Sequence, residues 1–182
     1  MASPTITKYD ELMARNKKVT QTHPGAPFIL GDIPKDSRPS IPILVVTCSD
    51  ARCDPNYFLS PEPLEMIIFR NQGGRVQNIL PDIISTDTLV RFQQIWVIHH
   101  NDCGASIVAE EDVRSAVGKL PGVEAKTLEA MVLPPFTDVE KSVRDDIAFL
   151  RSTPFLRKEL ADQVHGFLYD IKTGLLSPVV KS

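Results

Sequence analysis

Two short apolar runs in this chain each end in a candidate metal ligand. The run at 43–47 leads into Cys48, and the run at 95–98 leads to His100 and Cys103. Short β-branched runs of this kind, bounded by turn residues, predict buried strands of a parallel sheet. Because ligands of open α/β sheets bind outside the carboxyl ends of the strands, we expect the three side chains to meet at one edge of the sheet.

Cys48, His100 and Cys103 are one ligand short of a closed zinc site. Structural zinc sites use four protein ligands, whereas catalytic sites typically use three and leave the fourth position to water. Any one of these residues alone would more often be an ordinary buried residue, but core packing does not require the combination at two strand ends. The pattern therefore predicts a catalytic metal site. Cys53 is predicted to be a packed thiol, and His99 a packing or supporting residue.

Asp50 and Arg52 follow closely behind the first candidate ligand. On an exposed loop such a pair is usually a surface salt bridge worth about 0–1 kcal/mol. Beside a metal, a carboxylate that a guanidinium keeps ionised can accept a proton or a hydrogen bond from a metal-bound water. It can also become the fourth metal ligand. Both roles stay open for Asp50 on the sequence pattern alone.

The composition limits the partners and the location of the protein. The 182 residues suit a single domain, predicted at 1–182, whose core needs no disulfides. The balance of 20 Lys and Arg against 23 Asp and Glu does not indicate nucleic acid or an anionic membrane as a partner. Three cysteines without a dense framework favour a reducing compartment. There is no apolar run near the length of about 20 residues that spans a membrane, and no signal-peptide core, so we expect a cytoplasmic protein.

Local patterns predict the elements of the first half of the chain. A helix at 9–18 would lie on a surface or on a partner subunit, and 20–42 has the composition of an irregular connector. Asp54 before Pro55 predicts a capped helical turn. The glycines of the loop at 70–75 permit positive φ angles or a close approach of the backbone.

Periodicity and capping signals predict three further helices. The first is expected at 80–92, with Ile84, Thr88 and Leu89 on one side, and the second at 104–117, with Ile107, Val108 and Val113 facing inward. The third begins with a capping box at 137–140 and has Val139, Val143, Ile147 and Leu150 on one stripe. Strands are predicted at 64–69 and 166–170, the second followed by a tight turn at 172–174 and a return strand at 175–180.

Four motifs, in their order and spacing, resemble those of the β-class carbonic anhydrases. They are C-S-D-A-R at 48–52, R-N-Q-G-G-R at 70–75, H-H-N-D-C-G at 99–104 and G-F-L-Y-D-I-K-T-G-L-L at 166–176. The resemblance covers about 9–180, and the short length with the H-H-x-D-C-G form is similar to the small branch of the class known from archaea and fungi. Gln72 departs from the family pattern, in which Ala is usual.

This resemblance implies a fold and a state of assembly. The fold would be α/β, with a mostly parallel central β-sheet, an antiparallel edge strand and flanking helices. The chain would form a homo-oligomer, either a dimer or a dimer of dimers, with active sites at the subunit interface. Within it, the helix and connector at 1–42 would contact the partner subunit.

The resemblance also implies the chemistry. Cys48, His100 and Cys103 would be the ligands of a zinc ion, and Asp50 and Arg52 would be the catalytic pair. The implied reaction is the reversible hydration of carbon dioxide to bicarbonate and a proton, in which hydroxide on zinc attacks the carbon. Asp50 would orient the hydroxide, and Arg52 would orient Asp50.

Two alternatives stay open. The same scaffold could hydrolyse carbon disulfide or carbonyl sulfide, in which case access to the pocket would decide the substrate. The chain could instead be a zinc-binding interaction subunit without catalysis, with Asp50 as a fourth ligand. The Asp50 and Arg52 pair argues against the second alternative, because a purely structural zinc site has no need of Arg52.

Overall fold

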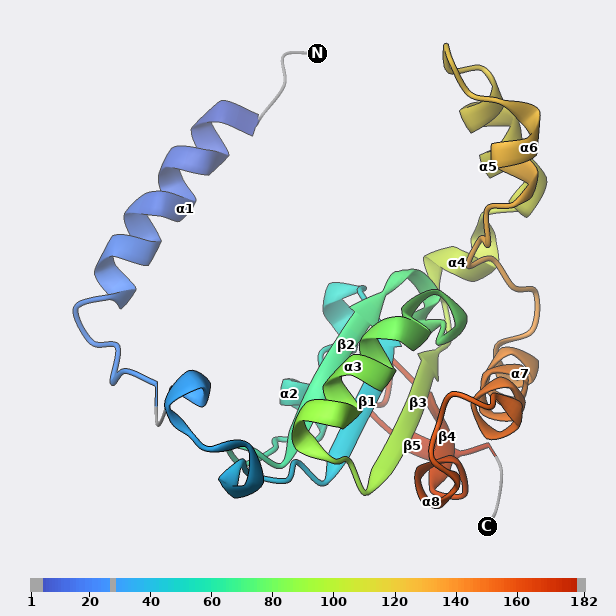
Figure 1. Cartoon of the computed structure of the whole chain (residues 1–182). Helices are drawn as coiled ribbons and strands as arrows, with labels where there is room; N and C mark the ends of the chain where they lie inside the picture. Colours follow the sequence, from blue (N-terminus) through green and yellow to red (C-terminus); the bar gives the residue numbers. More distant parts are fainter. Residues whose placement is uncertain (1–4, 27–28, 180–182) are drawn as a thin grey trace. The chain divides into compact units, whose positions relative to one another are not determined.

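The computed structural model describes residues 5–26 and 29–179, and the chain divides into two compact units, Met1–Arg38 and Pro39–Ser182. The first unit contains helix α1, Thr5–Val19, followed by two short 3-10 turns at Leu30–Asp32 and Lys35–Ser37 (Figure 1). The predicted helix at 9–18 is therefore confirmed, and the chain after it is irregular as expected.

The second unit is built on one twisted sheet. Its strands are β1, Ile43–Cys48; β2, Met66–Asn71; β3, Gln94–His100; β4, Val164–Tyr169; and β5, Leu176–Pro178. Along the sheet their order is β2-β1-β3-β4-β5, and only the β4–β5 pair among the described strands is antiparallel (Figure 1). The expected α/β fold, with a mostly parallel sheet and an antiparallel edge strand, is confirmed.

Helices cover one face of this sheet. They are α3, Leu80–Val90; α7, Val139–Ser152; and α8, Lys158–Ala161. Their buried side chains join alternate strand residues, such as Leu44 and Val97, in one core cluster. The short helix α2, Pro55–Phe58, packs on the other face, where Ile68 and Trp96 stay only half-buried.

Strand ends bring the candidate site together, because β1 and β3 are adjacent and parallel. Thr47 pairs with Ile98, and His100 pairs with Tyr169 of β4. Cys48 and His100 are the last residues of their strands, so both lie at the carboxyl edge of the sheet.

Helix α3 differs from its prediction in length and orientation. It ends at Val90, where Arg91 has a φ of 55°, and its buried residues are Ile83, Asp87 and Val90. The side on which Ile84, Thr88 and Leu89 were placed is not the buried side, since Thr88 and Leu89 are exposed and Ile84 is half-buried. The cause is a buried acid, because Asp87 pairs with Arg157 at 2.9 Å between Oδ2 and Nε. An apolar pattern assigns such a residue to the surface.

The helix predicted at 104–117 is also broken. It forms as α4, Gly104–Ile107, and α5, Glu110–Gly118, with extended backbone at Val108 and Ala109 between them. The predicted inward positions Ile107 and Val108 are exposed, and Val113 is half-buried. Ala105 is buried instead, and its carbonyl accepts a hydrogen bond from the Phe136 amide at 3.1 Å. This contact with a later loop holds α4 in place and interrupts the helix.

Helix α7 begins one residue later than the capping box predicted. Its N-cap is Asp138, whose carboxylate accepts a hydrogen bond from the amide of Lys141 at 2.9 Å. Thr137 is therefore outside the cap, whereas the apolar stripe of α7 is buried at Val143, Ile147 and Leu150, as predicted, and half-buried at Val139.

The other predicted elements form with shifted ends. Asp54 caps α2, and β2 and β4 each begin or end within two residues of prediction. The return strand forms as β5, although the predicted end at residue 180 lies outside the described residues. Helix α6, Ala125–Glu129, follows α5 and was not predicted. Within the described part of the chain, every helix is too short or too polar to cross a membrane.

Candidate metal centre

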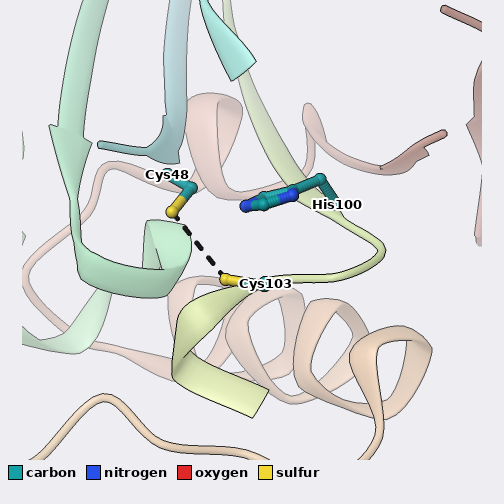
Figure 2. A group of neighbouring side chains, drawn as sticks. All are labelled: Cys48, His100 and Cys103. Atoms are coloured by element: carbon teal, nitrogen blue, oxygen red, sulfur yellow. Dashed lines mark hydrogen bonds between the residues drawn. The ribbon is translucent and has the colours of Figure 1, made fainter. Parts of the chain in front are cut away.

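Cys48, His100 and Cys103 lie together at the carboxyl edge of the sheet (Figure 2). One potential ligand atom from each lies within 4.8 Å of the others, and all three side chains are buried. Cys48 ends β1, whereas Cys103 follows β3 after a tight turn in which Asp102 has a φ of 54°. That turn, together with the start of α4 immediately after it, aims the Cys103 thiol back at Cys48.

His100 offers one free lone pair to this group. Its Nδ1 lies 2.8 Å from the backbone carbonyl of Asn101. Because a carbonyl can only accept a hydrogen bond, Nδ1 carries the proton and Nε2 is left with its lone pair. This Nε2 is buried and has no hydrogen-bond partner among the described residues. An unpartnered buried nitrogen is costly unless a ligand takes it up.

The two sulfur atoms have the spacing that a zinc ion requires. Cys48 Sγ and Cys103 Sγ are 3.8 Å apart, and both thiols are free (Figure 2). Two Zn–S bonds of about 2.3 Å at a tetrahedral angle separate the sulfurs by roughly 3.8 Å. Two thiols and one imidazole are also the donor types that zinc prefers. The residues present therefore fit a zinc ion.

Ionisation is shared unequally between the two thiols. Hydrogen bonding with Cys103 lowers the pKa of Cys48 to about 3, with further support from the backbone amides of Asp50 and Gly73. The same contact, together with burial, raises the pKa of Cys103. The pair thus holds one negative charge readily, and the second ionisation is opposed by the first. A bound cation would remove that opposition.

Asp50 and Arg52 form an ion pair beside the group. The Asp50 carboxylate accepts hydrogen bonds from Arg52 Nη2 at 2.7 Å, Nε at 3.0 Å and the backbone amide at 2.9 Å. These contacts with Arg52 hold the pKa of Asp50 at about 2, so the carboxyl is ionised at neutral pH. Among the described residues, the cluster of potential ligand atoms does not include Asp50, because its carboxylate is engaged by Arg52.

Arg52 also reaches the loop after β3. Its Nη1 donates to Asp102 Oδ2 at 2.8 Å, and its Nη2 donates to the Asp102 carbonyl at 3.1 Å. One guanidinium therefore joins the loop that carries Cys48 to the turn that carries Cys103. No role was predicted for Asp102 from the sequence alone. The position of Asp102 inside the motif H-H-N-D-C-G, next to the candidate ligand Cys103, was the signal that could have pointed to it.

The end of β2 and the glycine loop after it support the Cys48 loop. Arg70 Nε donates to the Cys48 carbonyl at 3.1 Å, and Arg70 Nη2 donates to the Asp50 carbonyl at 2.6 Å. Gly74 has a φ of 70°, and a Cβ there would lie 3.0 Å from the Thr47 carbonyl carbon. The prediction that these glycines allow positive φ and close approach is confirmed. Arg70 was quoted only as part of a motif, and its structural role was missed.

His99 and Cys53 lie outside the cluster, as predicted. His99 is fully buried, with Nδ1 2.7 Å from Ser142 Oγ and Nε2 3.2 Å from the Gly74 carbonyl. Both of its ring nitrogens are engaged, so it supports the glycine loop. Cys53 is buried near Thr47, and burial raises its pKa to about 11. The Gln72 side chain is exposed.

Comparisons with known proteins identify chains that are similar in sequence and in fold. The β-carbonic anhydrase 1 of Mycobacterium bovis is 27% identical over 142 residues, which cover 78% of this chain and 83% of that protein. A crystal structure of carbonic anhydrase from Streptococcus mutans is 28% identical, covers 94% of this chain and 97% of that chain, and has a TM-score of 0.77. The apo form of a carbon disulfide hydrolase, 20% identical, covers 97% of this chain and 93% of that chain with a TM-score of 0.60, which shows a shared fold alone.

A buried group of two thiols and one imidazole at the carboxyl edge of a parallel sheet defines an α/β protein with a metal-binding site. A family model described as carbonic anhydrase matches residues 43–176, most of the second unit. The chain belongs to the carbonic anhydrase family, and the relatives above put it in the β class.

Proposed function

We propose that this chain catalyses the reversible hydration of carbon dioxide to bicarbonate and a proton, with zinc held by Cys48, His100 and Cys103. The observation that carries the proposal is the His100 Nε2 atom, which is buried, unpartnered among the described residues and close to two free thiols. Within the β class, the short chain and the H-H-x-D-C-G motif favour the small branch known from archaea and fungi.

In this proposal the three ligands, Asp50 and Arg52 have different roles. Bound zinc would supply a water-derived nucleophile at neutral pH and would act as a Lewis acid. Cys48, His100 and Cys103 would hold the ion. Asp50, as an ionised acceptor beside the site, would accept a hydrogen bond from the nucleophile and so orient it toward the carbon. Arg52 keeps Asp50 ionised and would keep it away from the ion, since its guanidinium donates to both carboxylate oxygens, from Nε to Oδ1 and from Nη2 to Oδ2.

A stopped-flow assay of carbon dioxide hydration, with zinc quantified in the same samples, tests the function. Asp50→Asn keeps the shape of the side chain but weakens its acceptor, so kcat/KM should fall by about 10²–10⁴-fold while zinc stays bound. Arg52→Ala should also keep zinc and lose activity, because the released carboxylate can reach the ion. Asp145→Asn, which alters only an exposed pair with Lys141, is the control. Parent-like rates in both Asp50→Asn and Arg52→Ala would contradict the mechanism.

Assays of the same samples distinguish two alternative functions. Carbon disulfide and carbonyl sulfide can be offered side by side with carbon dioxide, and a higher kcat/KM for either would favour the hydrolase. A zinc-loaded parent protein without turnover on any of the three would favour a non-catalytic interaction subunit. The ion pair between Asp50 and Arg52 argues against that last reading, because it keeps Asp50 from acting as a fourth ligand.

We also propose that the chain is a homodimer or a dimer of dimers. The sheet face opposite α3 supports this, because Ile68, Trp96 and Phe167 are only half-buried there. In helix α1, Leu12 and Met13 are exposed, and a helix of this length is marginal without a surface to cover. Residues 1–42 would contact the partner subunit as part of one functional domain at 1–182. Sedimentation at low concentration is the measurement, and a fully active monomer would contradict the proposal.

The cellular setting follows from composition. Three free cysteines and a site of two thiols suit a reducing compartment, so we propose a cytoplasmic enzyme with neither nucleic acid nor a membrane as partner. Fractionation of the native host with antibody detection checks this, and recovery with the membrane pellet would contradict it.

A further inference from the structure

The turn after β4 lies beside the loop after β3 and shares hydrogen bonds with it. Asp170 Oδ1 accepts a hydrogen bond from Asn101 Nδ2 at 2.9 Å. In the reverse direction, Asn101 Oδ1 accepts from the Ile171 amide at 3.0 Å, and the Asn101 amide donates to the Tyr169 carbonyl at 3.3 Å. Both ends of the Asn101 side chain and its backbone amide are therefore tied to the segment 169–171.

Asn101 is also the residue that orients His100. The remaining polar group of Asn101, its carbonyl oxygen, lies 2.8 Å from His100 Nδ1. The contact that keeps the proton on Nδ1, and so leaves Nε2 free, depends on a peptide group that the β4 turn holds in place. Asn101 and Asp170 are both half-buried, so water competes only in part for these bonds.

Asp170 is itself firmly held. Its carboxylate accepts hydrogen bonds from the Lys172 amide and from Thr173 Oγ1, each at 2.9 Å. The Asn101 amide, followed by these two donors, keeps the pKa of Asp170 below its usual value. An ionised carboxylate in this position is a strong acceptor for the Asn101 amide group. The motif Y-D-I-K-T-G at 169–174, which the proposed reaction does not use, thus ends against the loop of the metal site.

We propose that Asn101 and Asp170 form a positioning pair that fixes the tautomer and the direction of the His100 imidazole toward the metal. The inference rests on the proposed zinc site and does not depend on the substrate. Hydrogen-bond partners of metal-bound histidines typically change metal affinity by about 10–100-fold when removed. A role limited to shaping the turn would leave the zinc affinity unchanged.

Zinc affinity, measured by competition with a chromophoric chelator at constant pH, is the test. Asp170→Ala and Asn101→Ala should each raise the zinc dissociation constant by about 10–100-fold. The zinc dissociation constant of the double variant should lie within about 3-fold of the higher of the two single-variant values, because both changes disrupt the same hydrogen-bonded pair. Thr173→Ala, which removes one bond to Asp170 but leaves the Asn101 contact, is the matched control and should stay within about 3-fold of the parent.

A second readout follows the imidazole directly. Nitrogen chemical shifts of His100 in the zinc-free protein report which ring nitrogen carries the proton. Asn101→Ala should populate both tautomers, whereas the parent should show only the form protonated at Nδ1. Should Asp170→Ala fail to fold, Asn101→Ala carries the test alone. Affinities of both alanine variants within 3-fold of the parent, or a parent that does not bind zinc, would overturn the inference. A parent that binds zinc but does not hydrate carbon dioxide would contradict only the proposed function, and the affinity pattern would still support the positioning pair.

Discussion

Arg75 and Asp146 form a two-point ion pair that joins the glycine loop to helix α7, with Nη2 2.9 Å from Oδ1 and Nε 3.0 Å from Oδ2. Asp146 is almost fully buried and also lies 3.3 Å from His99 Nε2. The loop that carries Gly74 is therefore fastened to the helical layer by charge as well as by packing.

Removal of this carboxylate should destabilise the fold strongly. Asp146→Ala leaves the mostly buried Arg75 guanidinium without its partner, and such a change costs about 3–5 kcal/mol of unfolding free energy. Urea denaturation of the zinc-loaded protein measures it. The neighbouring Asp145→Ala, whose exposed partner is Lys141, should cost at most about 1 kcal/mol. Equal losses of unfolding free energy in the two variants would show that the buried ion pair stabilises the fold no more than the exposed pair does.

The three cysteines should separate into two classes by metal content. Cys48→Ala and Cys103→Ala each remove one of the two clustered thiols, so elemental analysis should find little zinc in either purified variant. Cys53→Ala removes a buried thiol outside the cluster and should retain about one zinc per chain. Full zinc occupancy in Cys103→Ala would refute the assignment of that ligand.

Gly74→Ala should damage both stability and metal binding. A Cβ at this position would lie 3.1 Å from the Cys48 amide nitrogen and 3.1 Å from His99 Cδ2, in addition to the strain of a φ of 70°. Backbone atoms at the end of β1 would have to shift, and with them Cys48. We expect the unfolding free energy to fall by more than the roughly 1–3 kcal/mol that a positive φ costs a residue other than glycine, and we expect zinc to bind more weakly.

Gly122→Ala is the matched control for this change, because Gly122 has a φ of 83° but nothing lies within 4 Å of the position of the new Cβ. It should show the conformational strain and an unchanged zinc dissociation constant. A Gly74→Ala protein that unfolds at the same urea concentration as Gly122→Ala would show that the close approach to β1 is unimportant.

Gly166→Ala should test how tightly α7 packs on β4. The new Cβ would lie 2.5 Å from Val143 Cγ1 and closer still to Ile147 Cδ1, so the helix must move or its side chains must leave their rotamers. Overpacking of this kind typically costs about 1–3 kcal/mol of unfolding free energy. The double variant with Gly166→Ala and Val143→Ala should lose less unfolding free energy than the sum of the two single variants, because the smaller side chain at 143 makes room for the new methyl group. Strict additivity would argue against direct contact.

Local patterns were sufficient for the strands and for the place of the site. The runs before Cys48 and His100 are apolar because most residues of β1 and β3 are buried, and parallel neighbours necessarily end at the same edge. The Asp54 cap and the positive φ of Gly74 depend on nearest neighbours and on the side chain of a single residue, so they too could be predicted.

The sequence by itself thus determined the α/β sheet and the meeting of Cys48, His100 and Cys103. Only the tertiary structure decided which side of α3 is buried, because the Asp87 charge is neutralised by Arg157, 70 residues away. It also decided where α4 breaks, through the Phe136 amide on the Ala105 carbonyl, and how Asn101, the neighbour that orients His100, is held by Asp170 of the β4 turn. In each case the decisive partner is distant along the chain, and hydrophobic periodicity contains information only about neighbours a few residues apart.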